Sequence, residues 1–101
     1  MAPPNVRVDN YHQNSVIVRF DPLPESQHGG DLKGYNVYYI REKDHYDYDY
    51  QGEKVSIGLS DTHAIIHGLE VMEKYYVWVS AFNSEEGPPS EPQSIVVGRA
   101  F

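Results

Sequence analysis

Side chains that could do chemistry gather in one stretch, residues 44–51, whose sequence is DHYDYDYQ. The aspartates could offer oxygen ligands to Ca²⁺, but the alternation would spread them along a strand, and the glycine-containing loop of an EF-hand is missing. The tyrosines, Tyr46, Tyr48 and Tyr50, each lie beside aspartate. This acidic context suits sulfation in a secreted protein or phosphorylation inside a cell. We therefore expect no calcium site, and the sequence leaves tyrosine modification open.

A pair of histidines is the second candidate for chemistry. His63 and His67 form an H-x-x-x-H pattern, which on a helix would place both rings on one face. The sequence between them predicts a strand, where such a spacing spans about 13 Å at ~3.3 Å per residue. One metal ion cannot bridge that distance, so we expect two separate, exposed histidines and no metal site.

Local signatures of catalysis are missing from the sequence. Serine, histidine and aspartate all occur, but no G-x-S-x-G elbow brings a nucleophile into position. No glycine-rich loop of the kind that holds phosphate is present. The chain has no cysteine, which excludes disulfides, thiolate zinc sites and cysteine nucleophiles. We therefore expect a protein that is not an enzyme and that carries no cofactor.

Length and charge restrict the class of partner. The chain has 101 residues, which is enough for one domain with its own core. It carries 8 basic and 15 acidic residues, for a net charge of −7. Nucleic acid and anionic membranes prefer a basic surface, so we expect neither as a partner. The longest apolar runs, such as Ser94–Gly98, are too short to cross a bilayer.

The elements that must position these side chains are strands. Apolar and polar residues alternate along the chain, and proline or glycine signals recur between the alternating segments. No window of useful length repeats apolar residues at helical spacing. The pattern predicts seven strands, at residues 5–9, 15–20, 32–41, 53–57, 63–67, 74–83 and 93–98. Short strands without a long helical crossover predict an all-β, antiparallel two-sheet sandwich, and a barrel of similar strand count remains open.

One segment also carries a family resemblance. Residues 68–90, GLEVMEKYYVWVSAFNSEEGPPS, resemble the most recognisable part of a fibronectin type III domain. The matching positions are Leu69, Tyr75, Val77, Val79, Ala81, Asn83 and Gly87–Ser90 in this segment, Leu32, Tyr35, Val37 and Tyr39 in the third predicted strand, and Pro4, Val6 and Val8 in the first. The resemblance covers nearly the whole chain. It implies a seven-stranded immunoglobulin-like sandwich over residues 4–98.

The sequence departs from the family pattern at several positions. Phe20 stands where the family usually has a tryptophan, and Val71 and Glu73 replace the usual proline and threonine. The stretch between the third predicted strand and Glu53 is also longer than expected. Met1-Ala2 before Pro3-Pro4 indicates that residues 1–3 are an added start or linker, and we expect residues 99–101 to lead into a following domain.

The resemblance implies the core as well. Tyr75 would form a tyrosine corner, with its ring in the core and its hydroxyl bonded to backbone near Leu69. The central packing layer would consist of Leu69, Tyr35, Phe20, Val77 and Val79. With this parity, the alternate positions of the third and sixth strands face outward.

The outward positions predict a protein-binding surface. The third and sixth strands are neighbours in this topology, so Tyr38, Ile40, Tyr76 and Trp78 would form a contiguous aromatic patch. Residues 44–51 could form a hairpin arm against Tyr35–Arg41, interrupted at Gly52, which would bring the tyrosines beside the patch. The predicted binding residues are Tyr38, Ile40, Tyr46, Tyr48, Tyr50, Tyr76 and Trp78. Cross-strand aromatic packing is the simpler explanation for the patch, and a partner surface is the functional one.

The function implied by the resemblance is that of a non-catalytic extracellular module. It would belong to a multidomain cell-adhesion or signalling receptor of the cell surface, resembling contactin-like adhesion molecules or receptor tyrosine phosphatases. It would act as a spacer between neighbouring domains of the same chain and as a docking surface for a protein with a basic patch. We expect no direct insertion of this module into the membrane. Two alternatives remain: a module of an intracellular muscle scaffold, and an accessory domain of a secreted carbohydrate-active enzyme.

Overall fold

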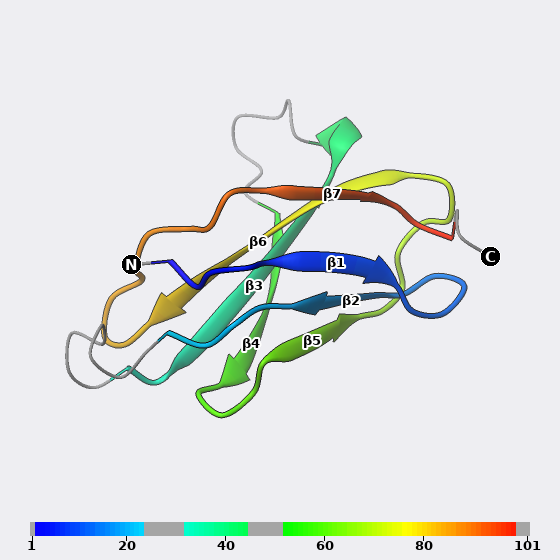
Figure 1. Ribbon diagram of the computed structural model, residues 1–101. Coiled ribbons are helices and arrows are strands. Elements are labelled where there is room, and N and C mark those ends of the chain that lie inside the picture. Colours follow the sequence, from blue (N-terminus) through cyan, green and yellow to red (C-terminus); the bar gives the residue numbers. More distant parts are fainter. Residues whose placement is uncertain (1, 24–31, 45–51, 99–101) are drawn as a thin grey trace.

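The computed structural model describes residues 2–23, 32–44 and 52–98 (Figure 1). The strands are β1 (Arg7–Asn10), β2 (Val16–Arg19), β3 (Gly34–Arg41), β4 (Glu53–Gly58), β5 (His63–Ile66), β6 (Lys74–Phe82) and β7 (Gln93–Val96), and a short 3₁₀ helix spans Glu42–Asp44. Each strand falls within a predicted segment or within one residue of it. Nowhere in these residues is there a helix long and apolar enough to cross a membrane.

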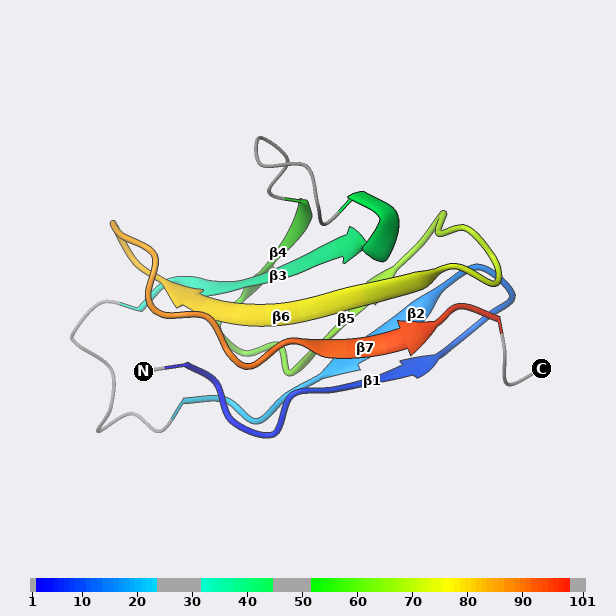
Figure 2. The same cartoon turned by 90° about the horizontal axis from the view of Figure 1, so that it is seen from above.

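The strands form two antiparallel sheets that face each other. One sheet has the order β1-β2-β5 and the other has the order β4-β3-β6-β7. Figure 2 shows the two layers seen from above, with β6 and β7 over β1, β2 and β5. The predicted all-β sandwich is therefore confirmed, and the barrel alternative is wrong because the two sheets do not close into one.

Buried and partly covered residues alternate along β6, and this alternation determines which face of the sheet forms the core. Tyr75, Val77 and Val79 are buried, whereas Tyr76 and Trp78 between them are only partly covered. Successive side chains of a strand point to opposite faces, so these apolar positions all face the second sheet. β3 pairs with β6 along its whole length, with Val37 opposite Val79 and Tyr38 opposite Trp78.

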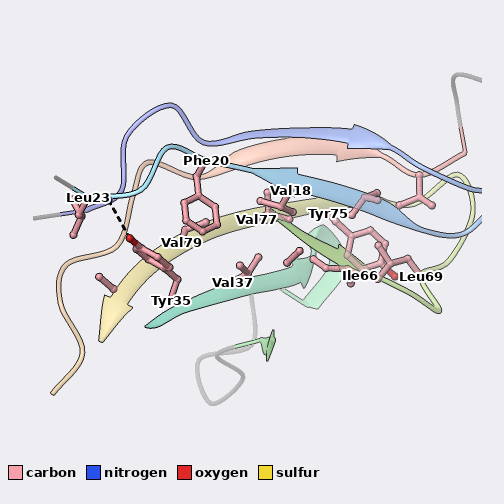
Figure 3. Packing of buried hydrophobic residues seen from close by; sticks show 14 residues of the cluster. Val18, Phe20, Leu23, Tyr35, Val37, Ile66, Leu69, Tyr75, Val77 and Val79 are labelled. Atoms are coloured by element: carbon pink, nitrogen blue, oxygen red, sulfur yellow. Dashed lines mark hydrogen bonds between the residues drawn. The ribbon is translucent and has the colours of Figure 1, made fainter. Parts of the chain in front are cut away.

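The core has the composition that the family resemblance implied. All members of the expected central layer, namely Phe20, Tyr35, Leu69, Val77 and Val79, belong to one cluster of buried side chains (Figure 3). The rings of Phe20 and Tyr35 meet edge to face with centroids 4.8 Å apart. The Tyr35 hydroxyl accepts a hydrogen bond from the Leu23 backbone N–H at 3.1 Å, which satisfies a polar group inside the core.

The expected tyrosine corner is present. The ring of Tyr75 is buried, and its hydroxyl accepts a hydrogen bond from the backbone N–H of Glu70 at 3.0 Å. The Leu69 backbone N–H donates to the Asn14 carbonyl at 3.0 Å, so the same turn is also bonded to the segment before β2. These bonds fix the chain where it crosses from one sheet to the other.

The predicted hairpin arm from residues 44–51 is wrong along most of β3. Residues Tyr35–Tyr39 pair with Ile57–Glu53 of β4 on one side and with β6 on the other, so no free edge remains there. Gly52 has a φ of 83° directly before β4, which fits the interruption expected at this residue. Tyr46, Tyr48 and Tyr50 lie outside the described residues.

Candidate functional site

A stacked aromatic pair occupies the outer face of the four-stranded sheet. The rings of Tyr38 and Trp78 have centroids 5.5 Å apart and planes inclined by 9°. The two residues are directly opposite each other in the β3–β6 register. Their rings therefore extend away from the core side by side, and each covers part of the other, so the structure brings together two of the predicted binding residues.

A carboxylate from the turn after β6 holds this pair from one side. Glu86 accepts hydrogen bonds from the Tyr38 hydroxyl at 2.6 Å and from Asn36 Nδ2 at 2.5 Å. Asn36 in turn accepts a hydrogen bond from the Ser56 hydroxyl at 2.6 Å. The turn is folded back toward the sheet, since Glu86 forms a β-bridge with Phe82. Tyr38 is thus fixed both by stacking and by its hydroxyl.

The pKa values of Tyr38 and Glu86 determine the charges of this network near neutral pH. Burial, together with the hydrogen bond to Glu86 and the charge of Glu86, raises the pKa of Tyr38 to about 12. Burial opposes ionisation of Glu86, but hydrogen bonds from Tyr38 and Asn36 and the positive charge of Lys54 hold its pKa below the ordinary value. A neutral phenol therefore donates to an ionised carboxylate.

One neighbouring hydroxyl is not fully satisfied. Ser80 Oγ is buried and has no hydrogen bond of normal geometry within the described part of the chain. It nevertheless lies close enough to the Glu86 carboxylate to contribute to lowering the Glu86 pKa. Ser80 therefore supports the network only weakly.

The second tyrosine of the predicted patch is anchored separately. The Tyr76 hydroxyl donates to the Glu42 carboxylate at 2.9 Å. Lys74 Nζ lies 3.4 Å from the same carboxylate and 5.5 Å from the centroid of the Tyr76 ring. Tyr76 therefore belongs to the same face as Trp78, but its polar end is already engaged by the short helix after β3.

Ile40 does not take part in an exposed patch, and this expectation was wrong. It has the outward parity of Tyr38, yet its side chain is only 4% exposed. The backbone at Gly52 approaches it so closely that a Cβ at that position would lie 3.3 Å from Ile40 Cβ. Gly52 thus covers part of the outer face of β3 here. Asn36 was also expected to point outward, and it is 5% exposed beneath Glu86.

The open side of Trp78 borders a cavity that the sequence did not reveal. Trp78, Pro89, Ser90 and Pro92 line a surface cavity of about 260 Å³. Ser90 fixes its wall, because its N–H donates to the Val79 carbonyl at 2.8 Å and its Oγ accepts from the Val79 N–H at 2.9 Å. The β6–β7 register, extended by one position, places Pro92 beside Trp78, and no local pattern of the sequence specifies that register.

A second cavity, of about 310 Å³, opens at the end of the sandwich near Arg41. Its charges are largely paired within the chain, since Arg41 lies 2.9 Å from a Glu70 oxygen and 3.3 Å from an Asp44 oxygen. The arginine side chain is therefore held by intramolecular contacts.

The histidines are separated in the structure. His67 Nδ1 lies 3.1 Å from the Ser15 hydroxyl, and His63 is opposite Arg19 in the β2–β5 register. Both side chains are exposed. Among residues 2–23, 32–44 and 52–98 there is no group of three histidine, cysteine, aspartate or glutamate residues that could hold a metal ion.

Known proteins resemble this chain over most of its length. The sequence profile of the fibronectin type III domain matches residues 1–96. Human protein sidekick-1 is 34% identical over 95 residues, which cover 92% of this chain and 4% of that protein. Mouse neural cell adhesion molecule L1 is 34% identical over 85 residues, which cover 80% of this chain and 7% of that protein. The chain thus spans only a small part of the curated relatives that it matches.

Solved structures show the same architecture. The third fibronectin III domain of the human KIAA0343 protein has a TM-score of 0.81 and 31% identity, and the match covers 96% of this chain and 81% of that chain. An fn3 domain of human contactin 1 has a TM-score of 0.82 over 100% of this chain and 80% of that chain. Its identity is 22%, so it supports the fold alone.

Proposed function

We propose, because the chain belongs to the fibronectin type III domain family, that it is a non-catalytic extracellular module of a multidomain cell-adhesion or signalling receptor. Relatives named for neural and neuronal cell adhesion support this proposal. The matched stretch is 7% and 8% of their lengths, which suits one module among many. In this role residues 4–98 act as a spacer between neighbouring domains and as a docking surface for a protein.

The observation that carries the docking role is the stacked pair of Tyr38 and Trp78. Tryptophan and tyrosine are favoured at the centres of protein interfaces because they bury a large area at a low cost in conformational entropy. Stacking and the Glu86 hydrogen bond already fix Tyr38, so little ordering remains for a partner to impose. Tyr76 extends the same face along β6. We call Tyr38, Tyr76 and Trp78 the aromatic face.

The charge of the chain defines the kind of partner. Glutamates border the aromatic face at Glu86 and Glu42, and the whole chain has a net charge of −7. A partner with a basic surface would be attracted to such a face before contact is made. Tyr46, Tyr48 and Tyr50 belong to this proposal as further contact residues, on the grounds of their sequence alone.

Binding of the purified chain to intact cells that display candidate receptors tests the docking role. Binding is measured by flow cytometry for the wild type and for Trp78→Ala and Tyr38→Ala, after circular dichroism has confirmed that each variant is folded. Leu59→Ala is the matched control, because Leu59 is an exposed apolar residue on the β4–β5 turn. We expect both aromatic variants to lose binding and the control to keep it. Wild-type binding by both aromatic variants removes this face from the proposal.

Location at the cell surface is tested on the full-length protein. A membrane-impermeant biotin reagent applied to intact cells labels only what lies outside the membrane. We expect labelling of the full-length protein and cleavage of this module by protease added to intact cells. Protection of the module from both reagents would place it inside the cell and contradict the proposal.

A further inference from the structure

The two sides of the Trp78 indole have different surroundings. On the β3 side the ring stacks on Tyr38. β6 lies between β3 and β7, so the opposite side of the ring faces the chain that leads into β7. There Trp78, Pro89, Ser90 and Pro92 line the cavity of about 260 Å³. One face of the indole is therefore backed by a ring, and the other borders an open space.

The cavity is pre-formed. The two hydrogen bonds between Ser90 and Val79 hold its wall to β6. Proline fixes the backbone φ, so Pro89 and Pro92 have little freedom to lose on binding. A ligand that enters this space meets rigid apolar groups on both sides and causes little ordering of the protein.

The charges around the cavity favour a cation. Glu91 stands in the chain between the lining residues Ser90 and Pro92, and it is exposed. It forms no ion pair within the described ranges. Lys54 on β4 is opposite Tyr38 on β3, which in turn is opposite Trp78 on β6. The lysine therefore lies on the far side of the stacked pair from the cavity. Glu91 thus adds a negative charge, unpaired within the described part of the chain, to the segment that forms the cavity wall.

A planar cation matches these features best. A guanidinium stacks on an indole face through the attraction of a cation to the π-system, and its edge can also donate to a carboxylate. A lysine ammonium has the charge without the planar stacking surface. Resting on the docking role proposed above, we propose that the cavity beside Trp78 takes the guanidinium of an arginine side chain presented by the basic surface of a protein partner.

The single tryptophan of the chain makes this proposal directly measurable. The ¹⁵N-labelled chain is titrated with the peptides acetyl-Gly-Arg-Gly-amide, acetyl-Gly-Lys-Gly-amide and acetyl-Gly-Pro-Pro-Gly-amide. We follow the indole N–H of Trp78 and the backbone N–H of Ser90 and Gln93. We expect the arginine peptide to shift all three signals and to bind about two- to fivefold more tightly than the lysine peptide.

Variants separate the proposed cavity from general attraction to an acidic protein. Glu91→Gln should weaken binding of the arginine peptide, and Trp78→Leu should abolish the shift at Ser90 while the rest of the spectrum shows a folded chain. Asp9→Asn is the matched control, because it removes the same charge from an exposed position of β1 on the other sheet. We expect this control to bind like the wild type.

Several outcomes would overturn the inference. Equal affinity for the arginine and lysine peptides would show attraction by charge alone, and tighter binding of the proline peptide would show an apolar occupant. Indole shifts that depend on protein concentration without any peptide would show that a second copy of the chain fills the cavity. If one of these results occurs while Trp78→Ala still loses cell binding, the docking role stands and only the arginine inference fails.

Discussion

The hydroxyl of Tyr75 and the backbone N–H of Glu70 are joined by a hydrogen bond of 3.0 Å that connects β6 to the turn before it. The ring of the same tyrosine is packed in the core. One side chain therefore contributes both apolar burial and the satisfaction of a backbone donor at a crossing between the sheets.

Replacing this tyrosine by phenylalanine isolates the hydrogen bond. Tyr75→Phe keeps the ring and leaves the Glu70 N–H without its partner. We expect a loss of about 1 kcal/mol or somewhat more in the free energy of unfolding. Urea denaturation measures it, and an unchanged midpoint would contradict the role assigned to this hydroxyl.

The stacked pair on the outer face should contribute less to stability than the core does. Trp78→Ala removes the contact with Tyr38, for which we expect a loss of about 0.5–1.5 kcal/mol beyond the loss of buried area. Val79→Ala on the same strand removes fully buried methyl groups and should cost roughly 2 kcal/mol. Val79 is 0% exposed. A Trp78→Ala loss well above that of Val79→Ala, measured by urea denaturation, would show that the pair is chiefly a structural element.

The network of Glu86 and Tyr38 predicts a particular dependence of stability on pH. The pKa of Glu86 is lowered in the folded chain, so its contribution is present above the ordinary value of 4.5 and is lost as the pH falls through the folded-state pKa. The pKa of Tyr38 is raised from 10.0 to about 12, so its contribution is present below pH 10.0 and is lost as the pH rises toward about 12.

Thermal denaturation of wild type and variants across pH tests this dependence. Glu86→Gln should be less stable than the wild type at neutral pH, and the difference should shrink in acid as the wild-type carboxylate becomes protonated. Tyr38→Phe should flatten the loss of stability in the alkaline range. A difference between Glu86→Gln and the wild type that stays constant down to strong acid would contradict the charged network.

Two glycines with similar backbone angles provide a matched steric test. Gly52 has a φ of 83°, and a Cβ there would lie 2.6 Å from the Tyr39 carbonyl oxygen. Gly68 has a φ of 74° and no atom within 4 Å of such a Cβ. Gly68→Ala should therefore cost about 1–2 kcal/mol from backbone strain alone, and Gly52→Ala should cost clearly more. Equal losses in urea denaturation would show that the close approach at Gly52 relaxes freely.

Local pattern predicted the fold well because burial in a sandwich follows the alternation of side chains along each strand. The parity of Tyr75, Val77 and Val79 was readable directly, and so was the outward direction of Tyr38 and Trp78, whereas their position directly opposite each other came from the structure. Ile40 shows the limit of this reasoning. Its outward parity was right, but Gly52 lies against it, and parity carries no information about such a contact.

By itself, the sequence determined the strands, the side of each sheet that forms the core, and the aromatic identity of the outer face. These follow from the local spacing of apolar residues and from turn signals. Only the tertiary structure decided that Glu86 binds the side chains of Asn36 and Tyr38, and that Pro89 and Pro92 open a cavity beside Trp78. Such contacts join residues far apart in the chain, and they depend on how the turns fold back over the sheet, which no local pattern specifies.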